Sequence, residues 1–316
     1  MENRPGLLLC HEKRGDDLTP LINEKEHQRV LNECIDVPHQ QPENPIRLTD
    51  VGISGKTVWV RLPQGLLPFA ARLYVSLQST ARGIHMSRME EVISDLHERH
   101  FADLTEYAVA LAERMMLRQD ADAGRLFLEG KLPVKRQGSV SRKLSIDSMD
   151  VSAEVQVRRH DQKAVPYKVR IGTGVCHITA CPCTQVYNQT LYNTNHECCP
   201  LPTHSQRSIT HLRMDSVDGF PSYGDLLACL EESLHVTQDL LKRQDEAEIV
   251  LKSHSIPQFA EDAVRATARA VTDRFYQQLP HDTGIEIESV SLESIHIHDV
   301  HCRLETTLAA LHEQLT

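Results

Sequence analysis

Apolar and polar positions alternate along much of the chain, and the period of this alternation changes from segment to segment. A period of two with β-branched or aromatic residues predicts a strand, and apolar residues at helical spacing predict a helix. From residue 51, the first half predicts two strands, two helices and two further strands. These segments are, in chain order, 56–62, 70–77, 89–96, 104–115, 149–157 and 167–178.

The second half repeats roughly the same order of elements. Its segments are a short strand at 208–214, one long helix at 226–242, a helix at 259–275 entered through Pro257, and a strand at 285–297. Consecutive strands with short connections favour antiparallel pairing, and paired helices would cover one face of the sheet. The pattern therefore predicts an α+β fold with an internal structural duplication.

Residues 1–48 differ from the rest because they show no sustained period. The stretch 36–45 is rich in proline and polar residues, which is typical of an extended segment. We expect an N-terminal arm over residues 1–48.

Composition and charge narrow the classes of function. The 316 residues are 40% hydrophobic and 25% charged, as in soluble globular proteins. The net charge of -10 argues against nucleic-acid binding as the main function. The apolar runs are far shorter than a membrane span, and the N-terminus lacks the pattern of a signal peptide. A cytoplasmic protein without a membrane partner is therefore expected.

The nine cysteines are the first residues that point to a metal-binding or reactive site. Four of them, with two histidines, lie within residues 180–208. An odd number of clustered cysteines without an export signal favours metal binding or reactive thiols over disulfides. Pro182 should hold Cys181 in an extended conformation, which would turn the Cys181 and Cys183 side chains to the same side. One thiol could then bind a metal while the other stays reactive.

Three later clusters add polar groups of the same kind. They lie at 203–208, at 240–246 with Glu261 further on, and at 293–298. On a strand, His296 and His298 would share one face and could address one site. Thiolate, imidazole and carboxylate groups together are typical of a catalytic divalent metal, which lowers the pKa of bound water to about 7.

Six motifs in this order resemble the type IB GTP cyclohydrolase I family, the prokaryotic alternative to the zinc enzyme of folate synthesis. The resemblance covers about residues 49–302. The motifs are DVGI at 50–53, GIHMSR at 83–88, CPC at 181–183, HSQRS at 204–208, LKRQDE at 241–246 and ESIHIH at 293–298.

The resemblance implies a tunnelling fold of two tandem modules, at 49–160 and 161–316, with the cysteine site in the second. It also implies a homotetramer with active sites at subunit interfaces. The implied reaction converts GTP and water to 7,8-dihydroneopterin triphosphate and formate, which is the first step of folate or 7-deazaguanine synthesis. Water attacks C8 of the purine, the imidazole ring opens, and recyclisation follows.

The resemblance also implies residue roles. Cys181 would be the thiolate ligand of one divalent ion per site, which is Zn²⁺, Mn²⁺ or Fe²⁺. Cys183 would contact the purine near C8, and Glu261 would bind the guanine edge. Further metal surroundings would come from His204, Glu246 and His296. Acid–base catalysis or orientation of a ligand would come from Glu293 and His298. The triphosphate would be bound by His85, Arg88, Arg207, Lys242 and Arg243.

Two departures from the family pattern stand out. The interval from Cys183 to His204 is longer by about eleven residues, and loops tolerate such added length at small cost. The extra stretch, with His196, Cys198 and Cys199, could be a second metal site, a redox-sensitive lid or a surface insertion, and we favour the insertion. Gln244 stands where the family pattern has proline.

Other functions remain open at this point. One alternative is another tunnelling-fold enzyme acting on a pterin or a deazapurine, for instance a nitrile reductase, which would need NADPH but no divalent metal. A metal-binding or storage protein that kept the fold would bind an ion through His196, Cys198 and Cys199 without turning over GTP. In the plainest alternative, the cysteines are only small buried apolar groups.

Overall fold

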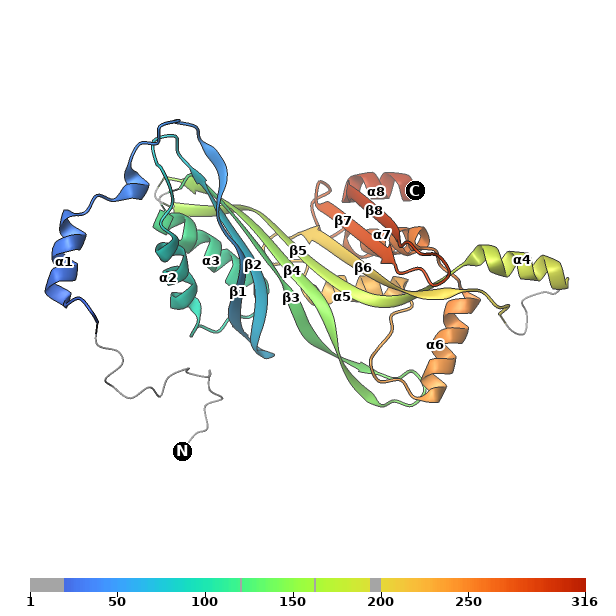
Figure 1. The fold of residues 1–316 in the computed structure, drawn as a ribbon. Coiled ribbons are helices and arrows are strands. Elements are labelled where there is room, and N and C mark those ends of the chain that lie inside the picture. Colours follow the sequence, from blue (N-terminus) through green and yellow to red (C-terminus); the bar gives the residue numbers. More distant parts are fainter. Residues whose placement is uncertain (1–19, 120, 162, 194–199) are drawn as a thin grey trace.

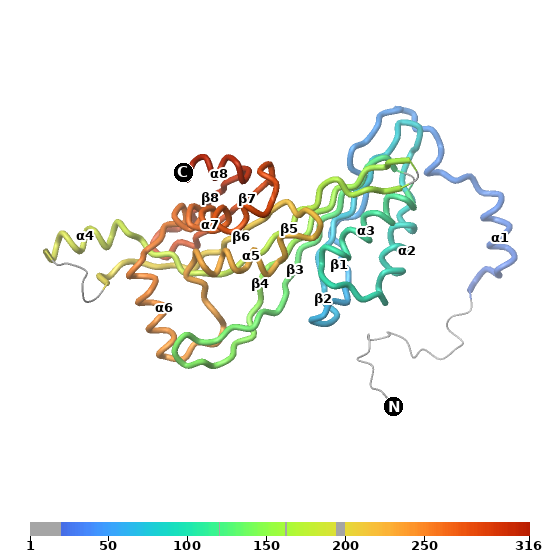
Figure 2. Tube along the Cα trace, turned by 180° about the vertical axis from the view of Figure 1, so that it is seen from behind, coloured from blue at the N-terminus to red at the C-terminus, as the bar shows by residue number. Residues whose placement is uncertain are grey.

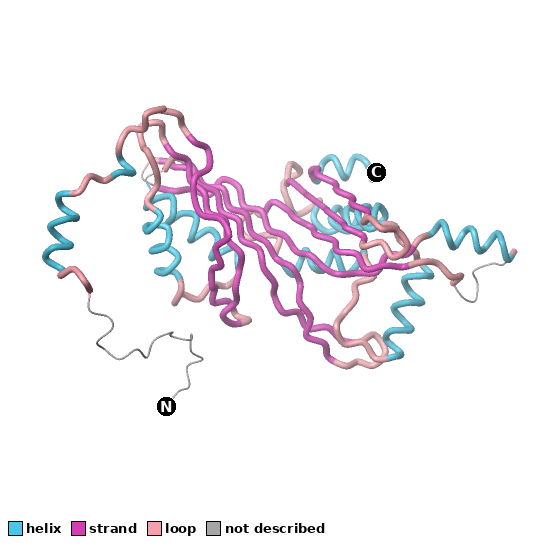
Figure 3. The backbone as a smooth tube through the Cα atoms, in the orientation of Figure 1, coloured by secondary structure: helices cyan, strands magenta, loops and turns pink. Residues whose placement is uncertain are grey.

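One antiparallel sheet organises the whole protein. The computed structural model describes residues 20–119, 121–161, 163–193 and 200–316. Eight strands in these ranges form the sheet, and each strand pairs with its neighbours in chain order from β1 to β8 (Figure 1). Figure 3 shows these strands as one continuous twisted layer. The predicted α+β class with antiparallel strands is therefore confirmed.

The first half of the sheet carries a pair of helices between its second and third strands, as predicted. The hydrophobic pattern does not predict β3, because Gly130 and Pro133 interrupt its alternation. The elements are β1 (Leu48–Leu62), β2 (Gly65–Leu77), α2 (Met86–Leu96), α3 (Leu104–Gln119), β3 (Ala123–Gln137) and β4 (Leu144–His160).

The second half has more helices than the first. The predicted strands at 167–178 and 208–214 and the predicted helix at 259–275 are confirmed. The elements are β5 (Lys163–Ala180), α4 (Pro182–Tyr192), β6 (Ser205–Asp215), α5 (Tyr223–Ser233), α6 (Arg243–Ser255), α7 (Ala260–Phe275), β7 (Gly284–Ser291), β8 (Val300–Thr307) and α8 (Leu308–Leu315).

The two helix groups share one apolar core on one face of the sheet. Buried side chains of α2, α3, α5 and α7 join those of the strands in a single cluster. The groups also touch directly, because Thr105 of α3 donates a hydrogen bond to Tyr223 Oη of α5 (3.1 Å). No helix in the described ranges combines the length and apolar character needed to cross a bilayer.

The two faces of β5 have different surroundings. Successive side chains of a strand point to opposite faces. Ile171, Thr173 and Val175 point to the helices and are buried. Cys176 and Ile178 point to the opposite face and are only partly buried. This part of the second face is therefore not covered by helices.

The predicted long helix at 226–242 is wrong. Helix α5 ends at Ser233 and α6 starts at Arg243. Strand β4 pairs with β5 only as far as Gly174, so the later backbone groups of β5 need another partner. Residues 235–237 supply it, since Ile178 N donates to His235 O (3.0 Å) and Thr237 N donates to Cys176 O (3.1 Å).

The predicted strand at 285–297 is too long. Strand β7 ends at Ser291, and residues 292–299 form the loop to β8. The sequence pattern predicts neither β8 nor α8. The module boundaries at 48/49 and 160/161 stay a prediction, because the sheet is continuous from β4 to β5.

The N-terminal arm contains a helix that the sequence pattern does not predict. Helix α1 (Glu24–Glu33) starts at Asn23, whose side chain accepts a hydrogen bond from Glu26 N (2.9 Å). A short 3₁₀ helix, η2 (Val37–His39), follows it. Helix α1 buries none of its residues and stands apart from the sheet in Figures 1 and 2.

Candidate functional site

Three segments meet where β5 ends, β6 begins and β7 ends. Cys181 N donates to His204 O (3.1 Å), and Thr203 Oγ1 donates to Cys181 O (2.6 Å). Leu292 N donates to Arg207 O (2.9 Å), which ties the β7–β8 loop to β6. These bonds place residues from three distant parts of the sequence side by side.

Three histidines gather at this meeting point. The ring centroids of His204 and His296 lie 6.4 Å apart, and those of His296 and His298 lie 5.3 Å apart in a stacked pair. The prediction that His296 and His298 share a strand face is wrong, because β7 has already ended at Ser291. The loop nevertheless brings both rings close together.

Glu293 is held beside the histidines by two hydrogen bonds. Its Oε1 accepts from Gln206 Nε2 (3.1 Å) and from Ser291 Oγ (3.0 Å). The other end of the Gln206 amide, Oε1, lies 3.2 Å from His204 Nδ1. An amide oxygen can only accept, so this orientation of the Gln206 amide pairs with the His204 tautomer that is protonated on Nδ1. That tautomer could bind a metal through Nε2. Sequence reasoning missed Gln206, although it lies inside the HSQRS motif.

Buried hydroxyl groups support this network from the helix side of the sheet. Thr179 Oγ1 lies 2.8 Å from Ser208 Oγ and 3.2 Å from Ser291 Oγ, and all three residues are buried. His177, on the same strand face as Thr179, has Nε2 2.8 Å from Thr210 Oγ1. Burial lowers the pKa of His177 to about 4, so this ring is neutral near pH 7.

The two cysteines of the CPC motif do not lie as predicted. Cys181 is extended, as expected before proline, but Pro182 is the first residue of α4 and Cys183 lies in its first turn. Proline suits this position because its fixed φ matches the helix and its missing N–H has no intrahelical partner there. The two thiols therefore do not share one side of an extended strand. Cys183 is exposed near the helix N-terminus, where negative charge is favoured.

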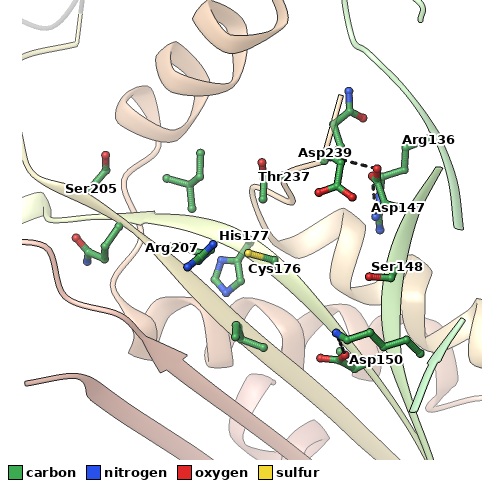
Figure 4. A pocket seen from close by; sticks show the side chains of 16 residues that line it. Arg136, Asp147, Ser148, Asp150, Cys176, His177, Ser205, Arg207, Thr237 and Asp239 are labelled. Atoms are coloured by element: carbon green, nitrogen blue, oxygen red, sulfur yellow. Dashed lines mark hydrogen bonds and ion pairs between the residues drawn. The ribbon is translucent and has the colours of Figure 1, made fainter. Parts of the chain in front are cut away.

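A cavity of about 610 Å³ opens beside these residues on the sheet face away from the helices (Figure 4). Strands β3 to β6 and the chain at 237–239 line it. Arg207 is the one charged lining residue that the sequence motifs predict as part of a site. The others are Lys131, Arg136, Asp147, Asp150 and Asp239.

Most cations of the cavity are already paired. Lys131 Nζ lies 2.5 Å from Asp150 Oδ1, and Arg136 Nη1 lies 3.6 Å from Asp147 Oδ2. The hydrogen bond from His211 is the main reason that the pKa of Asp150 falls to about 2, so this carboxylate stays charged. Among the described residues, Arg207 has no carboxylate within ion-pair distance. It is thus the cavity cation most available to an anionic ligand.

The residues of the LKRQDE motif lie apart from this site in the single chain. Lys242, Arg243 and Glu246 are exposed at the start of α6. Their neighbour Asp245 is buried and accepts two hydrogen bonds from backbone N–H groups of the β3–β4 turn, both 2.9 Å. Hydrogen bonds from the turn lower the pKa of Asp245. This motif therefore fastens α6 to the turn.

The remaining predicted site residues are also separate. Glu261 is exposed at the start of α7 and lines a second cavity with Arg265 and Cys302. His85 and Arg88 lie at the start of α2, on the opposite side of the molecule from α4 in Figure 1. The predicted insertion residues His196, Cys198 and Cys199 lie outside the described residues.

One metal-like group of side chains occurs elsewhere. Asp36, His39 and His85 are, within the described ranges, the single set of three whose donor atoms all lie within 4.8 Å of one another. The four metal residues predicted from the motifs do not form such a set in one chain. Their joint role stays a prediction.

Comparisons with known proteins match this chain over most of its length. A family described as type I GTP cyclohydrolase folE2 matches residues 34–302. The GTP cyclohydrolase MptA of Methanococcus vannielii is 27% identical over 311 residues, covering 90% of this chain and 99% of that protein. MptA of Methanocaldococcus jannaschii is 28% identical over 312 residues, covering 90% and 99%.

Among solved structures, a uricase from Bacillus fastidious aligns with a TM-score of 0.48 and 9% sequence identity, covering 85% of this chain and 96% of the uricase. The family match begins at residue 34, whereas the region expected from the motifs begins at residue 49. The match therefore includes the end of the N-terminal arm. Because that match spans most of the sequence, the chain belongs to the type I GTP cyclohydrolase family described as folE2.

Proposed function

We propose that the protein is a metal-dependent GTP cyclohydrolase that converts GTP and water to 7,8-dihydroneopterin triphosphate and formate. Family membership supports an activity on GTP. The observation that carries the proposal is the Gln206 amide, which bridges Glu293 and the His204 ring at the place where the chain of Cys181 and the ring of His296 also lie. No comparable observation supports the alternative hypotheses of a reductase or a metal-storage protein.

The residues at the strand ends suit a divalent ion. Cys181, His204 and His296 offer one thiolate and two imidazoles, a donor set that binds Zn²⁺, Mn²⁺ or Fe²⁺. An ion bound there would supply Lewis acidity to the reaction. Glu293 accepts its hydrogen bonds through Oε1, which leaves Oε2 to accept or return a proton, and His298 lies stacked on His296 as a second acid–base group.

The open cavity offers room for the nucleotide. Arg207 projects into it and would bind phosphate oxygens, because a guanidinium can donate two parallel hydrogen bonds to them (Figure 4). Cys183 would contact the purine near C8 from the first turn of α4. Arg207 belongs to β6 and Cys183 to α4, so the two residues would bind different parts of the nucleotide.

Several proposed substrate residues lie too far apart in one chain to share a site. We assign them to neighbouring subunits of a homotetramer, whose interface sites would join them. Glu261 would bind the guanine edge and Glu246 would approach the metal. Phosphate contacts would come from His85, Arg88, Lys242 and Arg243.

Product analysis tests the reaction. GTP labelled with ¹⁴C at C8 is incubated with the full-length protein, and formate and the pterin are quantified after separation. The proposal expects one labelled formate for each pterin, with all three phosphates kept on the pterin. Label retained in the organic product would contradict the release of C8 as formate. Loss of phosphate would contradict the assigned product but not the cyclohydrolase activity.

A further inference from the structure

We propose that Asp36, His39 and His85 form a second site for a divalent transition-metal ion, separate from the Cys181 site. Within one chain the two sites lie on opposite sides, since His85 precedes α2 and Cys181 precedes α4 (Figure 1). This inference goes beyond the proposed function and does not depend on it.

The donor atoms already lie at distances that suit one ion. Ligand atoms about 2.1 Å from a tetrahedral ion lie roughly 3.4 Å from one another. His85 Nε2 lies 3.4 Å from His39 Nδ1 and 3.6 Å from Asp36 Oδ2. His39 Nδ1 and Asp36 Oδ2 are 2.7 Å apart because they share a hydrogen bond. An entering ion would displace that proton and widen only this pair.

The backbone holds the two segments of the site together. Arg82 N and Gly83 N both donate to Pro38 O, at 2.9 and 3.3 Å. His85 is fixed by Gln119, which accepts from its N–H (3.1 Å) and donates to its carbonyl (2.6 Å). The side chains of His39 and His85, 46 positions apart in the sequence, therefore converge because backbone hydrogen bonds join their two segments.

The donor set selects a class of metal. Two imidazoles and one carboxylate suit Zn²⁺, Fe²⁺, Co²⁺ or Ni²⁺, whereas Mg²⁺ and Ca²⁺ prefer oxygen ligands. Three protein ligands leave one position for water or a phosphate oxygen. The site is therefore compatible with the phosphate contact proposed for His85.

The bound ion would fasten the N-terminal arm to the first half of the sheet. Helix α1 buries no residue of its own, so few apolar contacts hold this arm in place. The ion would link η2 in the arm to the start of α2. Metal binding should thus protect residues 20–47 from proteolysis.

Zinc binding to the full-length protein tests the site. Equilibrium dialysis with Zn²⁺ alone is compared for the unchanged protein, His39→Ala and the control His160→Ala. His160 is an exposed histidine beside a carboxylate, 3.5 Å from Asp161, without a second imidazole. His39 is also exposed, so its replacement should not disturb the core. His39→Ala should weaken the second Zn²⁺ by roughly a hundredfold or more, and His160→Ala should leave it unchanged.

Two further comparisons separate this site from the catalytic proposal. Zinc should slow trypsin cleavage within residues 20–47 in the unchanged protein but not in His39→Ala. Cys181→Ala should keep the Zn²⁺ that His39→Ala loses. Equal Zn²⁺ affinity and equal proteolysis in the unchanged protein and His39→Ala would overturn the site, whatever the outcome with GTP.

Discussion

Gln206 determines which nitrogen of His204 is free. Its amide donates to Glu293 and so presents its oxygen to His204 Nδ1. In the tautomer that this orientation favours, Nε2 is the lone-pair atom. Under the proposed function, Gln206 would therefore influence metal affinity without being a metal ligand.

Replacing Gln206 tests this role. Gln206→Ala should lower metal affinity and kcat/KM by about 10- to 100-fold, because His204 loses its orienting partner. Metal titration and GTP kinetics measure both quantities. The matched control is the exposed Gln277. Similar affinities for Gln206→Ala and Gln277→Ala would show that the amide does not orient His204.

His177 makes the native state sensitive to acid. An unfolded chain binds a proton at histidine near pH 6.5, but burial lowers the native pKa of His177 to about 4. The unfolded state therefore binds more protons between these values, and native stability falls as the pH drops from 6.5 to 4. The expected loss is up to about 3 kcal/mol.

A His177→Gln variant should lose less stability over this range, since glutamine does not titrate. Urea unfolding at pH 7 and pH 4 gives the free energy of unfolding for both proteins. If the two proteins lose the same amount, His177 is not the group responsible.

At the scale of whole elements, the start of α4 separates the two thiols. Cys181 lies before the helix, beside His204, and Cys183 lies in its first turn. The spacing of two residues predicts one shared side only for an extended chain, and the proline that suggests extension is also a favoured first residue of a helix. Sequence alone could not decide between these two conformations.

The different positions predict different effects of replacement. Cys183→Ala should abolish GTP turnover and leave most of the bound metal. Cys181→Ala should lose metal as well as turnover. Metal content by atomic emission, measured together with formate release, distinguishes the two variants. Equal metal loss in both would refute the assigned division of roles.

The sequence predicts the fold best where the apolar period is unbroken. The helices at 104–115 and 259–275 and the strand at 149–157 follow directly from their side chains. Helix α6 has little apolar periodicity, and its start depends on the distant β3–β4 turn. Prediction of the site from the sequence is limited in the same way. The convergence of His204 with His296 depends on pairing of β6 with β7, such as Ser208 with Ser291, which no local pattern encodes.

At the scale of the whole molecule, the Cys181 site and the N-terminal arm lie at opposite ends of the sheet (Figure 1). The Cys181 site lies where β5 ends, β6 begins and β7 ends, and the Asp36 group includes His85 at the start of α2. The net charge is -10, yet Arg207 stands unpaired with carboxylates of the described residues in the cavity. A local cation thus suits an anionic nucleotide on an acidic protein.

The most direct test of a metal-dependent GTP cyclohydrolase is an anaerobic assay of the metal-stripped, full-length protein. GTP is added with Mn²⁺, Fe²⁺ or Zn²⁺, one ion at a time, and formate and the fluorescence of the oxidised pterin are followed together. We predict that both products appear in proportion and only when an ion is present. Tight metal binding without loss of GTP, or equal formate release without metal, would contradict the account.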